Sequence, residues 1–135
     1  MNELLHKELT DEIIKCYYTV YNKLGYGFLE KVYEKAMMIE LLKKNLKVES
    51  QKYIEVYYDN NVVGEYYADL IVEDKVIIEL KACEHLREEH ELQLINYLRA
   101  TTIEIGLLMN FGKEPEFSRK IFSNKTRNKS NKNPH

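Results

Sequence analysis

Three ionisable residues have a spacing that would bring them to one place. Asp69 lies in a strand-like segment, and ten positions later Glu79 and Lys81 flank Leu80 near the end of an apolar run. Side chains alternate between the two faces of a strand, so Glu79 and Lys81 share one face and Leu80 takes the other. Carboxylates beside an amine are the groups that a divalent metal and an attacking water require. The pattern therefore predicts a metal-dependent hydrolytic site.

The hairpin that contains these residues determines which of them face each other. The even positions in residues 66–72 and 76–82 are the more apolar set in both strands, so we expect all of them to face the core. If Val72 pairs with Val76, Asp69 lies directly opposite Glu79, with Cβ atoms about 4.5–5.5 Å apart. A two-residue turn would break this register, and the loop contains no glycine that would fix its shape. The register is therefore predicted from the apolar pattern alone.

Two facing carboxylates repel each other unless a positive charge lies between them. Mg²⁺ or Mn²⁺ takes oxygen ligands and keeps several waters, so we expect Asp69, Glu79 and the Leu80 backbone carbonyl to be metal ligands. Lys81 would lie beside the attacking water and stabilise negative charge in the transition state. The alternative is a solvated acidic face with a cross-strand Glu/Lys pair. The matched position of Asp69 favours the metal site.

The remaining elements can be predicted from periodicity. Apolar spacings of three and four predict a helix from an N-cap at Thr10 to a stop at Gly25, and a second helix that runs to about Asn45. Alternation predicts strands near residues 47–58, 62–72, 76–83, 103–110 and 117–122, with a helix near residues 87–100. The order ααβββαββ predicts an α/β fold built on a mixed sheet.

Length and composition indicate a single domain. The chain has 135 residues, and we assign residues 1–122 to the domain and residues 123–135 to a disordered basic tail. The apolar runs are too short to span a bilayer, and the first residues lack the pattern of a secretory signal. A cytoplasmic protein without a membrane partner is therefore expected.

Charge is distributed unevenly along the chain. The net charge is −2, yet the tail contains four basic residues and no acid. The preceding residues are therefore distinctly acidic, which argues against strong unaided binding to nucleic acid.

The spacing of the three ionisable residues resembles a known signature. Asp69 followed by Glu79, Leu80 and Lys81 looks like the motif of the PD-(D/E)XK nuclease superfamily, with Ala68 where proline often stands. This resemblance implies a restriction-endonuclease-like core and a divalent metal as cofactor.

A second set of motifs is more specific. Residues 27–33 read GFLEKVY and match the motif that names the GxxExxY protein family. Further segments that resemble this family follow in the same order and read YYADL, IELKA, QLINYL and NFG. The resemblance runs from about Leu9 to Phe122. The family is similar to the RecB-like branch of the superfamily.

The resemblance also implies roles for residues on the two other helices. Glu30 would complete the metal shell, and Gln93 and Tyr97 would line the site and contact the substrate. Each has a simpler reading: Glu30 stabilises the first turn of its helix, Gln93 is an exposed side chain, and Tyr97 is half-buried.

Two classes of function follow from these expectations. The first is a Mg²⁺- or Mn²⁺-dependent nuclease, for which DNA is a more favoured substrate than RNA and single-stranded or end-bearing DNA is the favoured form. The second is a binding or assembly module without catalytic activity. The acidic body favours either the second class or a nuclease that depends on a protein partner.

Overall fold

The computed structural model describes residues 5–125, and the elements follow the predicted order. The helices and strands of this part of the chain are α1 (Lys7–Leu24), α2 (Glu30–Lys43), β1 (Val48–Tyr58), β2 (Asn61–Val72), β3 (Val76–Lys81), α3 (Glu88–Arg99), β4 (Ile105–Phe111) and β5 (Pro115–Ile121). The mixed α/β fold and the ααβββαββ order are thus confirmed. Most of the predicted basic tail, from residue 126 onward, lies outside the described residues.

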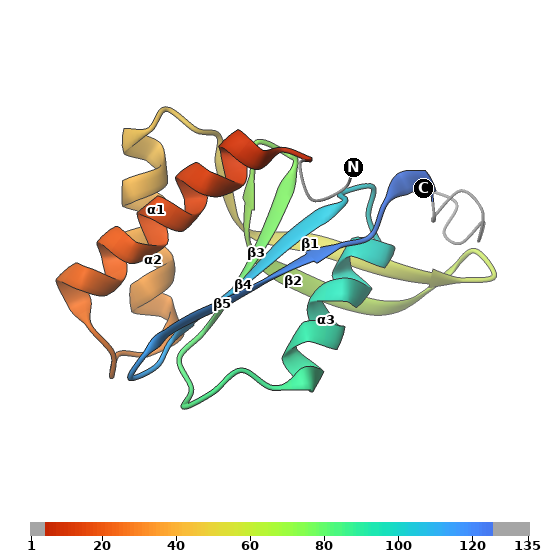
Figure 1. The fold of residues 1–135 in the computed structure, drawn as a ribbon. Helices are drawn as coiled ribbons and strands as arrows, with labels where there is room; N and C mark the ends of the chain where they lie inside the picture. Colours follow the sequence, from red (N-terminus) through yellow and green to blue (C-terminus); the bar gives the residue numbers. More distant parts are fainter. Residues whose placement is uncertain (1–4, 126–135) are drawn as a thin grey trace.

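One mixed sheet orders its strands β1-β2-β3-β4-β5. β3 and β4 run parallel because the chain crosses over between them through α3, whereas the other neighbouring strands are antiparallel. Helices α1 and α2 pack on one face of the sheet and α3 packs on the other (Figure 1). Within residues 5–125, no helix is long and apolar enough to cross a membrane.

Two apolar clusters, one on each face of the sheet, form the core. The larger cluster joins α1 and α2 to the sheet, and the smaller cluster joins α3 to it. The residues of β3 alternate between them as predicted, with Ile78 and Leu80 in the larger cluster and Ile77 in the smaller. The helices therefore cover both faces of the strand that carries Glu79.

The alternation in β2 changes face at Asp69. The sequence pattern predicts one face for all even positions from 66 to 72, but Ala68 packs in the smaller cluster and Leu70 in the larger. Gln51 of β1 lies across from Asp69 and has a left-handed backbone with φ of 51°. The regular pairing of β1 with β2 is interrupted at these two residues. The predicted shared face is thus wrong for the first part of β2, and the change of face coincides with this irregularity.

The hairpin between β2 and β3 has the predicted register. Val72 pairs with Val76, and the ladder continues toward the site from there. The loop residues Glu73 and Asp74 both have φ of 55°, a conformation that glycine adopts more readily. The Lys75 N–H donates to the Val72 carbonyl oxygen at 2.9 Å. The loop thus closes in the required register without a glycine.

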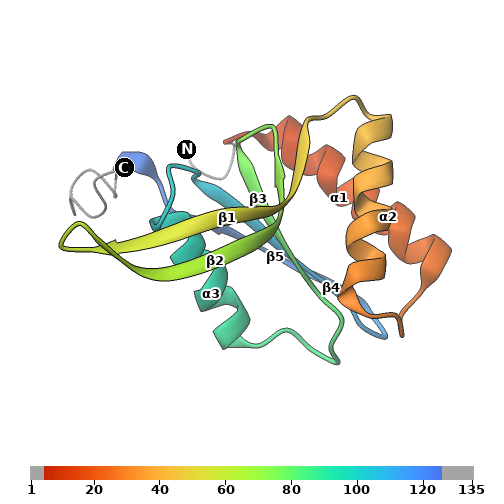
Figure 2. The ribbon, with the colours of Figure 1, turned by 180° about the vertical axis from the view of Figure 1, so that it is seen from behind.

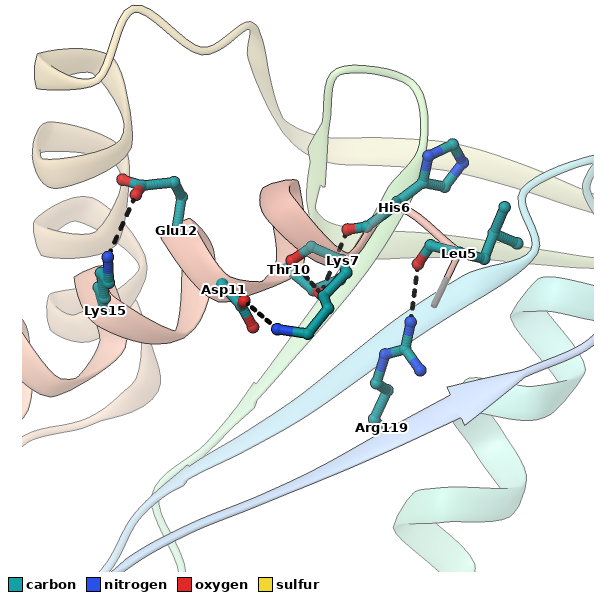
Figure 3. A network of polar contacts seen from close by, with 8 residues as sticks. All are labelled: Leu5, His6, Lys7, Thr10, Asp11, Glu12, Lys15 and Arg119. Atoms are coloured by element: carbon teal, nitrogen blue, oxygen red, sulfur yellow. Dashed lines mark hydrogen bonds and ion pairs between the residues drawn. The ribbon is translucent and has the colours of Figure 1, made fainter. Parts of the chain in front are cut away.

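Helix α1 begins one turn earlier than the sequence predicts. His6 is its N-cap residue, and the Thr10 hydroxyl donates to the carbonyl oxygens of His6 and Lys7 inside the helix. The predicted cap at Thr10 is therefore wrong, because its hydroxyl finds partners within the first turn. Figure 3 shows this end of α1 beside β5, where the Arg119 guanidinium donates to the Leu5 carbonyl oxygen at 2.7 Å.

Gly106 of β4 makes room for Leu94 of α3. A Cβ at position 106 would lie 2.6 Å from Leu94 Cδ1, and Leu94 is fully buried. We expect Gly106→Ala to lower the free energy of unfolding by about 1–3 kcal/mol, as overpacked cores do, in urea unfolding. The matched comparison is made on a Leu94→Ala background, where the added methyl group should have little effect. Wild-type stability of Gly106→Ala would contradict this packing.

Candidate active site

Asp69 and Glu79 lie side by side where β2 and β3 stop pairing. The backbone ladder ends at Leu70 and Ile78, and beyond it each carboxylate accepts a backbone hydrogen bond from the other strand. Glu79 Oε2 accepts from the Asp69 N–H at 2.8 Å, and Asp69 Oδ2 accepts from the Leu80 N–H at 2.8 Å. The two side chains thus replace ladder bonds and hold each other in place.

Burial makes this pair of carboxylates electrostatically unfavourable. Glu79 is only 5 % exposed, and its burial, followed by the charge of Asp69, raises the pKa of its carboxyl to about 8. The Asp69 N–H and the charge of Lys81 oppose this rise, and Glu34 adds to it. At neutral pH the pair by itself therefore holds a proton, which a divalent cation would displace.

The donor set fits a hard divalent cation. Each carboxylate gives one oxygen to a backbone N–H, so the oxygens that could bind a metal are Glu79 Oε1 and Asp69 Oδ1, the second of which also accepts from Gln51 Nε2 at 3.3 Å. Mg²⁺ and Mn²⁺ bind through one or two carboxylates and keep several waters. Among residues 5–125, no group of three or more His, Cys, Asp and Glu side chains is placed to hold a metal ion. Two carboxylate oxygens suit an ion that keeps its other positions for water and substrate.

Sequence reasoning missed two polar residues near this pair: Gln51 contacts Asp69 directly, and Glu34 is linked to it through Gln51. The Gln51 side chain donates to Glu34 Oε1 at 2.9 Å and to Asp69 Oδ1 at 3.3 Å. Glu34 is 6 % exposed, with Lys31 Nζ at 3.8 Å. The left-handed backbone of Gln51 is the kind of local strain that collects at functional sites. A third carboxylate, from α2, is thereby tied to the acid pair.

The apolar pattern of α2 contains a signal for Glu34. It lies three residues before Met37 and seven before Leu41, so it shares the buried side of the helix with them. A glutamate inside an apolar stripe is rarely buried without a partner. Glu30, which the family resemblance selected as a metal ligand, is instead exposed at the first residue of α2. Its role as a ligand stays a prediction.

Lys81 ends β3 and is half-buried beside the acid pair. Its charge lowers the pKa of Glu79, which places the amine within electrostatic reach of that carboxylate. The Leu80 N–H donates to Asp69 Oδ2. Metal binding by the Leu80 carbonyl oxygen stays a prediction. Asp69, Glu79 and Lys81 are therefore gathered at one end of the β2–β3 hairpin.

The chain beyond Lys81 is fixed by a buried amide on β4. The Cys83 N–H donates to Asn110 Oδ1 at 3.0 Å, and Asn110 Nδ2 donates to the Cys83 carbonyl oxygen at 2.9 Å. A Cβ at Gly112 would lie 2.7 Å from that same carbonyl oxygen. Asn110 and Gly112 therefore hold the segment that leaves β3 and restrict the position of Lys81.

Helix α3 brings Tyr97 to the acid pair. Tyr97 is 5 % exposed, and burial, followed by the charges of Glu79 and Asp69, raises the pKa of its hydroxyl to about 12. Gln93 lies one turn earlier, half-buried, and lines a cavity that Tyr97 also lines. Tyr97 is thus within electrostatic reach of the acid pair and shares a cavity with Gln93, while the contact of both residues with a substrate stays a prediction.

A mixed sheet between helices, with Asp69, Glu79 and Lys81 at one hairpin end, defines a nuclease-type α/β domain. A family model described as the PD-(D/E)XK nuclease superfamily matches residues 7–121. The chain belongs to this superfamily.

A solved structure supports the fold. The crystal structure of a protein called SSO0001 superposes with a TM-score of 0.54 at 20 % sequence identity. The match covers 87 % of this chain but only 60 % of that one, so this chain spans about three fifths of the length of its structural relative. No curated protein matches this chain.

The raised pKa of Glu79 predicts a pH-dependent stability. The folded carboxyl keeps its proton up to a pKa of about 8, whereas the usual value is 4.5. Between these values the folded state binds more protons than the unfolded state, so the free energy of unfolding should fall as pH rises. Urea titrations in a chelator from pH 4.5 to pH 9 would measure this fall.

In Glu79→Gln that part of the pH dependence should disappear, because the amide cannot ionise yet still accepts from the Asp69 N–H. The control is Glu114→Gln, which changes an exposed carboxylate in the turn between β4 and β5 and should keep the wild-type profile. A Glu79→Gln profile equal to that of the wild type would show that Glu79 titrates normally.

Proposed function

We propose that the protein is a Mg²⁺- or Mn²⁺-dependent nuclease that hydrolyses phosphodiester bonds in DNA, with single-stranded or end-bearing DNA as its favoured substrate. The observation that carries this proposal is the reciprocal hydrogen bonding of Asp69 and Glu79, with Lys81 next to Glu79 on the same strand face. Membership in the nuclease superfamily supports it.

Each residue of the site has a distinct task in this proposal. A bound divalent ion would polarise the phosphodiester and lower the pKa of a bound water. Asp69 and Glu79 would hold that ion, and Lys81 would stabilise the negative charge that develops on the phosphate oxygens. Gln93 and Tyr97 would contact the substrate from α3. Glu34, through Gln51, fixes the side-chain position of Asp69.

We further propose that the chain is a GxxExxY protein of the RecB-like branch. The structure of the turn before α2 explains why glycine and tyrosine occupy two positions of the motif. Gly27 has φ of 113°, and the Tyr33 hydroxyl donates to the Gly25 carbonyl oxygen at 2.7 Å and accepts from the Phe28 N–H at 3.2 Å. These contacts set where α2 begins, and thereby where Glu30 and Glu34 lie.

The second candidate is a binding or assembly module without catalytic activity. Its support is a set of exposed apolar side chains: Leu29, which precedes α2, and Val32, Ile39 and Leu42 within the helix. Apolar surface on the outer side of a helix is typical of a protein contact. A protein that binds a partner but cleaves neither DNA nor RNA would favour this candidate over the nuclease.

Mn²⁺ should stabilise the fold because it neutralises the two carboxylates. At a hundredfold excess over the dissociation constant, ligand linkage gives about 2.7 kcal/mol, which a thermal melt would detect as a higher Tm. Asp69→Ala should abolish this rise, whereas Glu114→Ala, which removes an exposed carboxylate, should keep it. A wild-type Tm that does not change in millimolar Mn²⁺ would count against the metal site.

Lys81→Ala separates chemistry from metal binding. The variant leaves both carboxylates in place, so Mn²⁺ should still raise Tm, but cleavage should fall by about 10²–10³, the scale for losing one electrostatic stabiliser. Lys75→Ala removes an exposed lysine just before β3 and should keep wild-type cleavage. Full activity in Lys81→Ala would exclude the mechanism and point to another site or to a contaminating nuclease.

A further inference from the structure

A groove lies between α3 and the β1–β2 hairpin, on the face of the sheet that carries the smaller cluster. Its volume is about 660 Å³, a size typical of small-ligand sites. Figure 2 shows the hairpin extending past the other strands with α3 beside it. The hairpin contributes Val56 and Tyr66 to the lining, and α3 contributes residues that include Leu92, Gln93, Asn96 and Tyr97.

The ring of Tyr66 forms an exposed aromatic wall of this groove. Tyr66 is 44 % exposed, and its ring centroid lies 5.6 Å from that of Tyr97. A Cβ on Gly64 would approach Tyr66 Cε2 to 3.0 Å and Val56 Cβ to 3.3 Å. The glycine therefore leaves space for the tyrosine ring against the hairpin, and part of the ring stays open to solvent.

The groove adjoins the acid pair. Tyr97 lines the groove. The charges of Glu79 and Asp69 contribute to raising the pKa of its hydroxyl. On β2, Tyr66 precedes Asp69 by three residues, roughly 10 Å at the rise of an extended strand. A phosphate bound at the acid pair would therefore have its neighbouring nucleotide within reach of the groove.

The chemistry of the walls suits a planar, partly apolar ligand. Tyr66 and Leu92 offer apolar surface, and the amides of Gln93 and Asn96 can both donate and accept hydrogen bonds, as base edges require. The chain has a net charge of −2, so attraction to phosphates contributes little overall. Stacking of a base on an aromatic ring contributes to binding without any positive charge.

We propose that this groove binds one unpaired nucleobase next to the scissile phosphate, with the Tyr66 ring as its stacking platform. The proposal rests on the proposed function and extends it, because it assigns a position to the base and makes single-stranded DNA the preferred form. The bases of a duplex are stacked and paired, so they cannot enter without being extruded.

The test uses the full chain and a DNA oligonucleotide that carries 2-aminopurine, whose fluorescence is quenched when it stacks. Binding is measured in EDTA, so that no cleavage occurs, for the single strand and for its blunt duplex. The wild type should bind the single strand more tightly and quench it. Duplex binding as tight as single-strand binding would overturn the proposal.

The variants isolate the ring. Tyr66→Ala should weaken single-strand binding by about tenfold to a hundredfold, the fold-change that corresponds to one lost stacking contact, and Tyr66→Phe should retain binding. Tyr66→Leu keeps apolar bulk over Gly64 and should lose binding as Tyr66→Ala does, which separates stacking from folding. The control is Tyr67→Ala: this tyrosine is 54 % exposed and contacts Tyr53 instead of Tyr97.

Equal effects of Tyr66→Ala and Tyr67→Ala would overturn the proposal even if the protein cleaves DNA. Conversely, binding that depends on Tyr66, in a protein that cleaves no nucleic acid with Mn²⁺, would support the groove and reject the nuclease. The two failures are therefore distinguishable, because one is read from binding without metal and the other from cleavage with metal.

Discussion

Asp69 and Glu79 each accept a hydrogen bond from the backbone of the opposite strand, and most of the site depends on these two hydrogen bonds. The side chains can meet only because the β2–β3 ladder ends at Leu70. Tyr97 of α3 lies within electrostatic reach of both carboxylates, and Gln51 of β1 donates to Asp69. The opening in the sheet is thus surrounded by parts of the chain that are distant in sequence.

Much of this arrangement could be predicted from the sequence because strand alternation is a strong constraint. The apolar even positions of β3 determine which of its residues face each side of the sheet. Val72 pairs with Val76 because this register buries the apolar side chains of both strands. Alternation fails at Asp69, where Ala68 and Leu70 point to different clusters. The change coincides with the left-handed backbone of Gln51 on the neighbouring strand β1, and glutamine is not a residue type that signals a left-handed conformation.

The segment 110–112 serves mainly to fix geometry. Phe111 stacks on Tyr33 at a centroid distance of 4.0 Å and an interplanar angle of 8°, which joins α2 to β4. Asn110 and Gly112, on either side of Phe111, hold the segment after β3. The short NFG sequence therefore connects the helix that carries Glu34 with the strand that carries Lys81. Phe111 contacts α2, whereas Asn110 and Gly112 contact the segment after β3.

The left-handed conformation of Gln51 has an evolutionary consequence. A non-glycine residue in this region destabilises the fold by about 1–3 kcal/mol, and replacement by glycine would relieve that strain. Glycine, however, would remove the amide that joins Glu34 to Asp69. Selection for thermal stability alone would therefore erode the site at this position. The strained backbone and the amide that holds the Asp69 carboxylate therefore belong to the same residue, so the strain cannot be relieved by glycine without losing that link.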